Sequence, residues 1–170
     1  IDSSGNLASN LGKIGLNNEV MSLHLVDSIL YIGGEFTFFS DNNVKKYSAQ
    51  FTSHDYNNVN PYFPQTNGEV NYSISDENGG FFIAGIFSLV GDSIRNNIAH
   101  IDSNGLISSW APNLSNIVKV NTMIKKGNDI IVSCLNFSTS GQFYSTILKN
   151  FICFFKIFSE VDSDKNPPLT

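Results

Sequence analysis

Apolar and polar residues alternate along several short stretches of this chain, most clearly near its middle. Val70, Tyr72 and Ile74 are separated by Asn or Ser, and a period of two residues is typical of a strand with one buried face. Residues 81–87 follow a turn at residues 76–80 and are apolar throughout, which predicts a strand covered on both faces. No stretch of this unit longer than a turn has a helical pattern, so we expect an all-β fold.

Two further strands are expected in the same unit. After a turn at residues 91–97, residues 98–101 form the third strand, and residues 106–110 form the fourth. Residues 102–105 between them are typical of a tight turn, in which Asp102 bonds the backbone and the glycine takes a positive φ. The unit is therefore predicted to contain four short strands.

The strand expected at residues 20–26 differs in polarity. It places Met21, Leu23 and Leu25 on one apolar face, which is the opposite parity from the strand at residues 70–75. We attribute the difference to a one-residue β-bulge.

The strand pattern recurs at intervals of about fifty residues. Val20, Val70 and Val120 each begin an expected strand, and residues 1–7 share an Ile-Asp-Ser opening and a Gly with residues 101–106. A third motif joins bulky apolar residues to small ones and then to Phe with a hydroxyl residue; its copies are residues 30–37, 81–88 and, in degenerate form, 130–138. Three motifs in one common register indicate an internal repeat.

Four strands in every fifty residues is the arrangement of a propeller blade, and closed propellers have about 4–8 blades. We therefore predict an incomplete β-propeller of about three four-stranded antiparallel blades, with a β-sandwich or β-solenoid as the alternatives. The expected boundaries are a remnant of a preceding blade at residues 1–17, blades at 18–67 and 68–117, a degenerate partial blade at 118–158 and a flexible tail at 159–170.

Large aromatic residues at related positions of these units are expected to fill the space between neighbouring sheets. They are Phe36, Phe87, Phe137 and Trp110. The outer sheets of such a fragment lack a neighbour, so we expect self-association of the isolated chain.

Two strings resemble the delta-sixty or kelch-like repeats. Residues 31–37 read YIGGEFT, and residues 95–99 read RNNIA and lead to Asp102, Gly105 and the WAPN ending at residues 110–113. The resemblance covers roughly residues 18–140. It implies propeller blades of large, often exported proteins, an extracellular or cell-surface location, and a binding or scaffold role with no catalytic residues to carry over.

Composition and charge argue against a nucleic-acid partner and against a membrane span. The net charge is −5 and the ten basic residues form no cluster, so no nucleic-acid partner is expected. The longest apolar stretch, residues 147–158, is interrupted by Lys149, Asn150 and Lys156. It is too short for a membrane span, which needs roughly 20 mostly apolar residues.

Metal chemistry finds little support in the sequence. His24 and His100 fall in expected strands and His54 in a turn, at different blade positions, so ordinary packing is the preferred interpretation. Cys134 and Cys153 lack metal-ligand spacing and are interpreted as small buried apolar residues, with a disulfide left open for an exported protein.

The remaining motifs have structural interpretations. The turns at Asp2 and Asp102 lack the EF-hand spacing and are interpreted as Asx turns. Gly33 and Gly34 lack the Lys-Ser/Thr of a phosphate loop and are assigned to close strand packing. Three glycosylation sequons, no more than chance placement gives, begin at Asn71, Asn113 and Asn136.

We therefore assign no catalytic, cofactor-binding or metal-binding residue and expect no cofactor. The leading hypothesis is a non-enzymatic binding or structural propeller segment of a larger surface or exported repeat protein, with an unknown protein or glycan as its partner. The alternative is the non-catalytic part of a galactose-oxidase-like or glycan-processing propeller enzyme, whose active site lies elsewhere.

Overall fold

The computed structural model describes residues 15–26, 29–38, 46–51, 59–112, 114, 117–136 and 155–158. Most of the expected preceding-blade remnant, the expected tail at residues 159–170, and Asp2, His54, Asn113, Phe137 and Cys153 lie outside these residues. Within them the fold is all-β, as predicted, with small antiparallel sheets of which none is closed.

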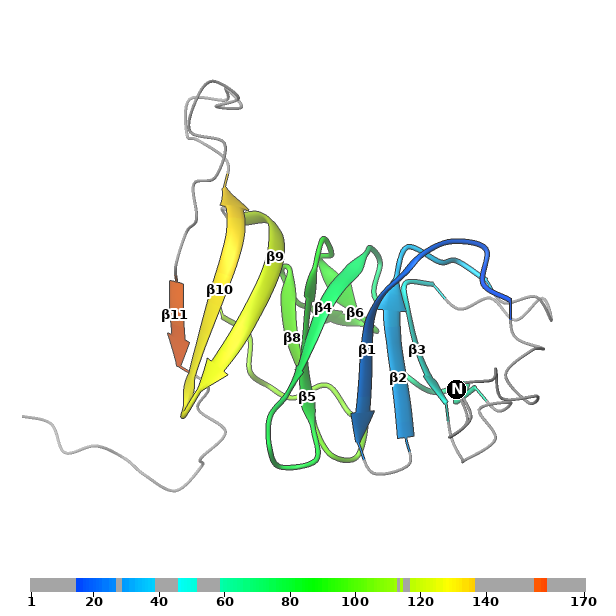
Figure 1. The fold of residues 1–170 in the computed structure, drawn as a ribbon, viewed down its shortest axis with the longest axis horizontal. Helices are drawn as coiled ribbons and strands as arrows, with labels where there is room; N and C mark the ends of the chain where they lie inside the picture. The colour runs from blue at the N-terminus through cyan, green and yellow to red at the C-terminus, as the bar shows by residue number, and fades with distance from the viewer. Residues whose placement is uncertain are drawn as a thin grey trace, which may run out of the picture.

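Three sheets stand side by side in the order of the chain (Figure 1). Sheet 1 contains β1 (Val20–Val26), β2 (Ile29–Gly34) and β3 (Ser48–Phe51). Sheet 2 contains β4 (Val70–Ser75), β5 (Phe81–Gly85) and β8 (Ile98–Ile101). Sheet 3 contains β9 (Ile117–Lys126), β10 (Asp129–Asn136) and β11 (Phe155–Phe158), and a separate hairpin contains β6 (Leu89–Val90) and β7 (Ser93–Ile94).

The strands expected at residues 20–26 and 70–75 are confirmed and the strand expected at residues 81–87 ends earlier, at Gly85, but the fourth strand expected in the middle unit is not formed. β1 pairs with β2, and β4 with β5, both antiparallel. The strand expected at residues 106–110 is reduced to a single bridge between Ile101 and Ile107. Its pairing ends because Trp110 turns towards Phe82 and because Pro112 has no N–H to donate. The described sheets are therefore three-stranded, and the expected turn at residues 91–97 contains part of the β6–β7 hairpin.

The first strand of every sheet carries the same irregularity. The register skips one residue directly after a valine: Met21 after Val20 in β1, Asn71 after Val70 in β4 and Asn121 after Val120 in β9, which begins at Ile117. These β-bulges lie fifty residues apart. Because all three strands have one, a bulge does not account for the different polarity of β1, and that explanation was wrong.

The polarity of β1 has another cause. Its polar residues Ser22 and His24 face sheet 2, where Ser22 Oγ lies 2.6 Å from Ser73 Oγ and the His24 ring stacks on Phe81 at 5.2 Å. The apolar residues of the strand, among them Leu23, are exposed on the opposite face. Equivalent positions of the strands thus point the same way, and only their side chains differ in polarity.

The core lies between the sheets rather than within one layer. We call the face of a sheet that contacts the next sheet along the chain its leading face, and the opposite one its trailing face. On sheet 2, Phe81 of the trailing face packs with Tyr31, and Phe82 of the leading face packs with Met123. The expected burial of aromatic residues is confirmed for Phe36 and Phe87, whereas Trp110 is only partly buried, against Phe82.

Candidate binding cavity at one end of sheet 2

An asparagine before β4 organises the end of sheet 2. Asn67 Oδ1 accepts hydrogen bonds from the backbone N–H groups of Ser88 and Leu89, both at 2.9 Å. Its Nδ2 donates to Ser88 Oγ, also at 2.9 Å. A short side chain that accepts hydrogen bonds from two successive backbone N–H groups takes the place of the backbone partner that a neighbouring strand would supply. It therefore fixes the segment that follows β5.

A second asparagine fixes the entry to β8. Asn97 has a φ of 64°, a left-handed conformation that Asn tolerates better than most residues. Its N–H donates to the Phe87 carbonyl at 2.8 Å, its Oδ1 accepts from the Phe87 N–H at 3.3 Å, and its carbonyl accepts from Gly85 at 3.0 Å. These bonds place the preceding residue, Asn96, beside the end of β5.

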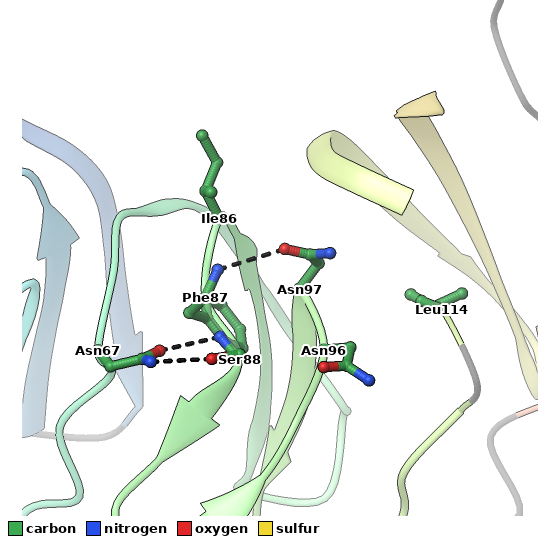
Figure 2. A pocket seen from close by; sticks show the side chains of 7 residues that line it. All are labelled: Asn67, Ile86, Phe87, Ser88, Asn96, Asn97 and Leu114. Atoms are coloured by element: carbon green, nitrogen blue, oxygen red, sulfur yellow. Dashed lines mark hydrogen bonds between the residues drawn. The ribbon is translucent and has the colours of Figure 1, made fainter. Parts of the chain in front are cut away.

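These segments border an open cavity of about 400 Å³. In Figure 2, Asn96 and Asn97 lie between the contact of Asn67 with Ser88 on one side and Leu114 on the other. The lining residues are Asn67, Ile86, Phe87, Ser88, Asn96, Asn97 and Leu114. Three amides and one hydroxyl supply both donors and acceptors, and no ionisable side chain is among the seven. Such a lining suits recognition of an uncharged polar ligand rather than proton transfer.

Sheet 1 has the same framework with a different lining. Asn17 Oδ1 accepts from the backbone N–H groups of Thr37 and Phe38 at 2.8 and 3.1 Å, and its Nδ2 donates to Thr37 Oγ1 at 2.9 Å. Tyr47 has a φ of 63° and donates to the Phe36 carbonyl at 2.7 Å. Where sheet 2 has Ile86, Asn96 and Leu114, the corresponding residues are Glu35, Lys46 and Pro64. The amide-rich lining is therefore a property of sheet 2.

The opposite end of sheet 2 holds a buried pair of a histidine and a carboxylate. His100 Nε2 lies 2.9 Å from Asp76 Oδ2, and both side chains are buried. Asp76 Oδ1 also accepts from the N–H groups of Asn78 and Gly80 at 2.7 and 2.8 Å. Burial raises the pKa of Asp76, but the hydrogen bonds from Asn78, His100 and Gly80 outweigh it and hold that pKa below its usual value. The pair joins the β4–β5 turn to β8 and is closed to solvent, so we assign it a structural role.

The histidines do not gather into a metal site. His24 lies on β1 and His100 on β8, and within the described ranges no three His, Cys, Asp or Glu side chains come together. Burial against Phe81 lowers the pKa of His24, and the charge of Asp76 opposes this shift. His24 is therefore a packing residue of the interface between sheets 1 and 2.

The structural interpretation of the turn and the glycines agrees with the geometry. Asp102 Oδ1 accepts from the N–H groups of Asn104 and Leu106, both at 2.9 Å, which is an Asx turn. A Cβ at Gly33 would overlap Val70, and one at Gly34 would overlap the Glu19 carbonyl. The two glycines thus permit close strand approach.

Two further residues considered from the sequence, Cys134 and Asn71, are buried. Cys134 is buried in the core between sheets 2 and 3, as expected of a small apolar residue. Asn71, the first residue of a sequon, is 7% exposed at the bulge of β4. An N-glycan there would require the strand to move, so the sequon is a poor acceptor in the folded chain.

No pattern in the sequence predicted the cavity. Asn67, Ser88 and Asn97 come from three segments, and a signal for them was present only in the recurrence of Asn17 at Asn67. The chain matches no protein-family model, no curated protein and no solved structure. Among the described residues there is no helix of the length and apolarity that a membrane crossing needs.

Proposed function

We propose that this chain is a non-catalytic, glycan-binding segment of a β-propeller, with the cavity at the end of sheet 2 as its ligand site. The lining of that cavity carries the proposal. The amides of Asn67, Asn96 and Asn97 and the hydroxyl of Ser88 match the donors and acceptors of sugar hydroxyl groups. Ile86, which is 37% exposed, offers an apolar surface for the C–H groups of a sugar ring.

The side chain of Asn96 is the part of the lining best placed to meet a ligand. Asn67 and Asn97 use their amides to hold backbone groups. Asn96 makes no hydrogen bond to the described residues and is half-buried. A bound sugar hydroxyl would therefore gain a donor and an acceptor without displacing an existing contact.

Two observations support the propeller assignment over a sandwich. Sheet 2 is covered on both faces by further sheets, as a blade is in a propeller, whereas a sandwich pairs two sheets face to face. Bulges and asparagine contacts recur at fifty-residue intervals, as expected for one supersecondary unit used repeatedly. On the resemblance to delta-sixty or kelch-like repeats we also propose that the segment belongs to a larger surface or exported protein.

A glycan array probed with the purified chain tests the ligand class. We expect binding to a restricted set of neutral glycans, and a loss of at least tenfold in affinity for Asn96→Leu, which keeps the size of the side chain but removes its donor and acceptor. Asn104→Leu is the matched control, because Asn104 is exposed in the turn at the other end of β8. An equal loss of glycan affinity in both variants, or no glycan bound by the wild type, would overturn the proposal. Binding to peptides alone would show that the ligand is a peptide and not a glycan.

A further inference from the structure

An asparagine is followed directly by a glycine at Asn67, Asn78 and Asn104 within the described residues. In such a pair the backbone nitrogen of the glycine can attack the side-chain carbonyl carbon of the asparagine, so that ammonia leaves and a succinimide ring forms. Water then opens the ring at either of its carbonyl groups and gives aspartate or isoaspartate. Glycine favours the attack because it has no Cβ and a mobile backbone. The surroundings of the glycine N–H and of the asparagine side chain therefore decide which pair reacts.

Two of the three asparagines occupy the same position in two similar turns. In the turn between β4 and β5, Asp76 Oδ1 accepts hydrogen bonds from the N–H groups of Asn78 and Gly80 at 2.7 and 2.8 Å. In the turn after β8, Asp102 Oδ1 accepts from the N–H groups two and four residues later, both at 2.9 Å. Asn78 and Asn104 are both exposed. The two turns thus form a matched pair.

The turns differ at the glycine that would make the attack. Gly105 is buried, and its N–H donates to the Asp102 carbonyl at 2.9 Å. In the other turn the Asp76 carbonyl accepts from Asn78 Nδ2 instead, at 3.3 Å, a length at which a hydrogen bond is weak. The N–H of Gly79, which is partly exposed, has no partner among the described residues. Attack by Gly105 therefore requires local opening of the turn, whereas the Gly79 nitrogen is already free.

The third asparagine is held by its own side chain. Asn67 uses its amide for three hydrogen bonds to Ser88 and Leu89. The following Gly68 packs so closely against β5 that a Cβ there would lie 2.0 Å from the Ile86 carbonyl oxygen. Attack on the Asn67 amide would break these contacts, so this pair is protected in the folded chain.

We propose that Asn78 is a modification site, at which the folded chain deamidates spontaneously with water as the second reactant and isoaspartate among the products. Isoaspartate continues the chain through its side-chain carbon, so it inserts a methylene into the backbone before Gly79. The Gly80 N–H, which donates to Asp76 Oδ1 at 2.8 Å, is then displaced. Because Asp76 Oδ2 lies 2.9 Å from His100 Nε2, the modification weakens the buried contact between this turn and β8.

Peptide mapping by mass spectrometry tests the site on the purified chain aged at mildly alkaline pH. We expect Asn78 to convert about tenfold faster than Asn104 or Asn67, because the slower pairs must first open locally. The control is the same chain aged in urea, where the three rates should converge, since glycine follows each asparagine. Equal rates in the folded chain, or a difference of the same size in urea, would overturn the proposal.

Urea denaturation tests the consequence for the contact of Asp76 with His100. The deamidated fraction is isolated by ion exchange, and its isoaspartate content is taken from the peptide map. Asn78→Asp is the matched control, because it introduces the same charge on an unaltered backbone. We expect the deamidated fraction to unfold at a lower urea concentration than Asn78→Asp, and equal midpoints would overturn the effect on the contact. Glycan binding by the freshly purified chain is measured at the other end of sheet 2, so its outcome is independent.

Discussion

The interfaces on the two sides of sheet 2 are built on the same backbone register but with different chemistry. Between sheets 1 and 2, Ser22 contacts Ser73 and His24 stacks on Phe81, beside a buried apolar cluster that includes Tyr31, Phe81 and Ile83. Between sheets 2 and 3, the residues that meet are almost entirely aliphatic or aromatic; they include Phe82, Ala84, Ile98, Val120, Met123, Ile130 and Val132. Stacking of the sheets therefore depends on the register and bulges, and the side chains can change from polar to apolar without altering it.

Each interface also contains one buried polar pair at the third strand. In sheet 1 it is neutral: Gln50 Nε2 donates to the Tyr31 hydroxyl at 3.0 Å. In sheet 2 the residue fifty positions later is His100, and its partner is the carboxylate of Asp76. The pair of neutral groups in the first interface does not titrate in acid, whereas the carboxylate of Asp76 makes the second pair sensitive to acid.

The largest expected effect comes from a cavity in the apolar interface. Met123→Ala removes a fully buried side chain between sheets 2 and 3 and should lower the free energy of unfolding by about 2–5 kcal/mol. Urea denaturation followed by circular dichroism measures it. Ile94→Ala, at an exposed position, should change the free energy by less than about 0.5 kcal/mol. Equal effects of the two variants would show that sheets 2 and 3 do not pack as described.

A somewhat smaller effect, with its own pH dependence, is expected from Asp76. Asp76→Asn removes the negative charge of a carboxylate that His100, Asn78 and Gly80 contact. It should lower the free energy of unfolding by about 1.5–3 kcal/mol at pH 7. The folded-state pKa of Asp76 lies below its unfolded value, so the folded state favours the charged form. The stabilisation is fully present above the unfolded pKa of about 4 and is lost as the pH falls through the folded pKa.

Urea denaturation at a series of pH values separates this contribution. The difference in unfolding free energy between wild type and Asp76→Asn should be constant above pH ~5 and shrink below pH ~4. Gln50→Ala is the comparison in sheet 1, because it removes a buried group that does not titrate. Its difference from the wild type should not shrink in that acid range, and a parallel decline in both variants would contradict the assignment to Asp76.

Sequence patterns predicted the strands better than the contacts between them. The alternation at residues 70–75 and the apolar run at residues 81–87 were enough to place the β4–β5 hairpin, because strand polarity is a local property. The fourth strand failed because Trp110 packs on Phe82, a residue of another strand, and so leaves the edge of the sheet. Propensity at residues 106–110 carries no information about that contact.

The cavity and the contact of Asp76 with His100 were not predicted, for a related reason. Asp76 and His100 are 24 residues apart and meet only because β4, β5 and β8 are neighbours. Asn97 was placed in an expected turn, but the role of Asn67 and Asn97 in holding the segment after β5 depends on the partners that the fold supplies. The fifty-residue spacing was the one signal that linked them to equivalent positions in sheet 1.

The smallest expected effect concerns the polar contact between sheets 1 and 2. Ser22→Ala and Ser73→Ala each remove one member of a hydroxyl pair that is 2.6 Å apart and partly buried. Each substitution should lower the free energy of unfolding by about 0.5–1.5 kcal/mol, because a neutral hydrogen bond contributes roughly that amount to folding. The double variant should lower it by less than the sum of the two single effects, since neither hydroxyl is then left without its partner. A double-mutant cycle in urea measures the coupling, with Ser22 and the distant Ser103, which is exposed in the turn after β8, as the control pair. Additive effects for Ser22 with Ser73 would mean that this contact does not join sheets 1 and 2, and that the interface is held by the packing of Tyr31 and His24 on Phe81 instead.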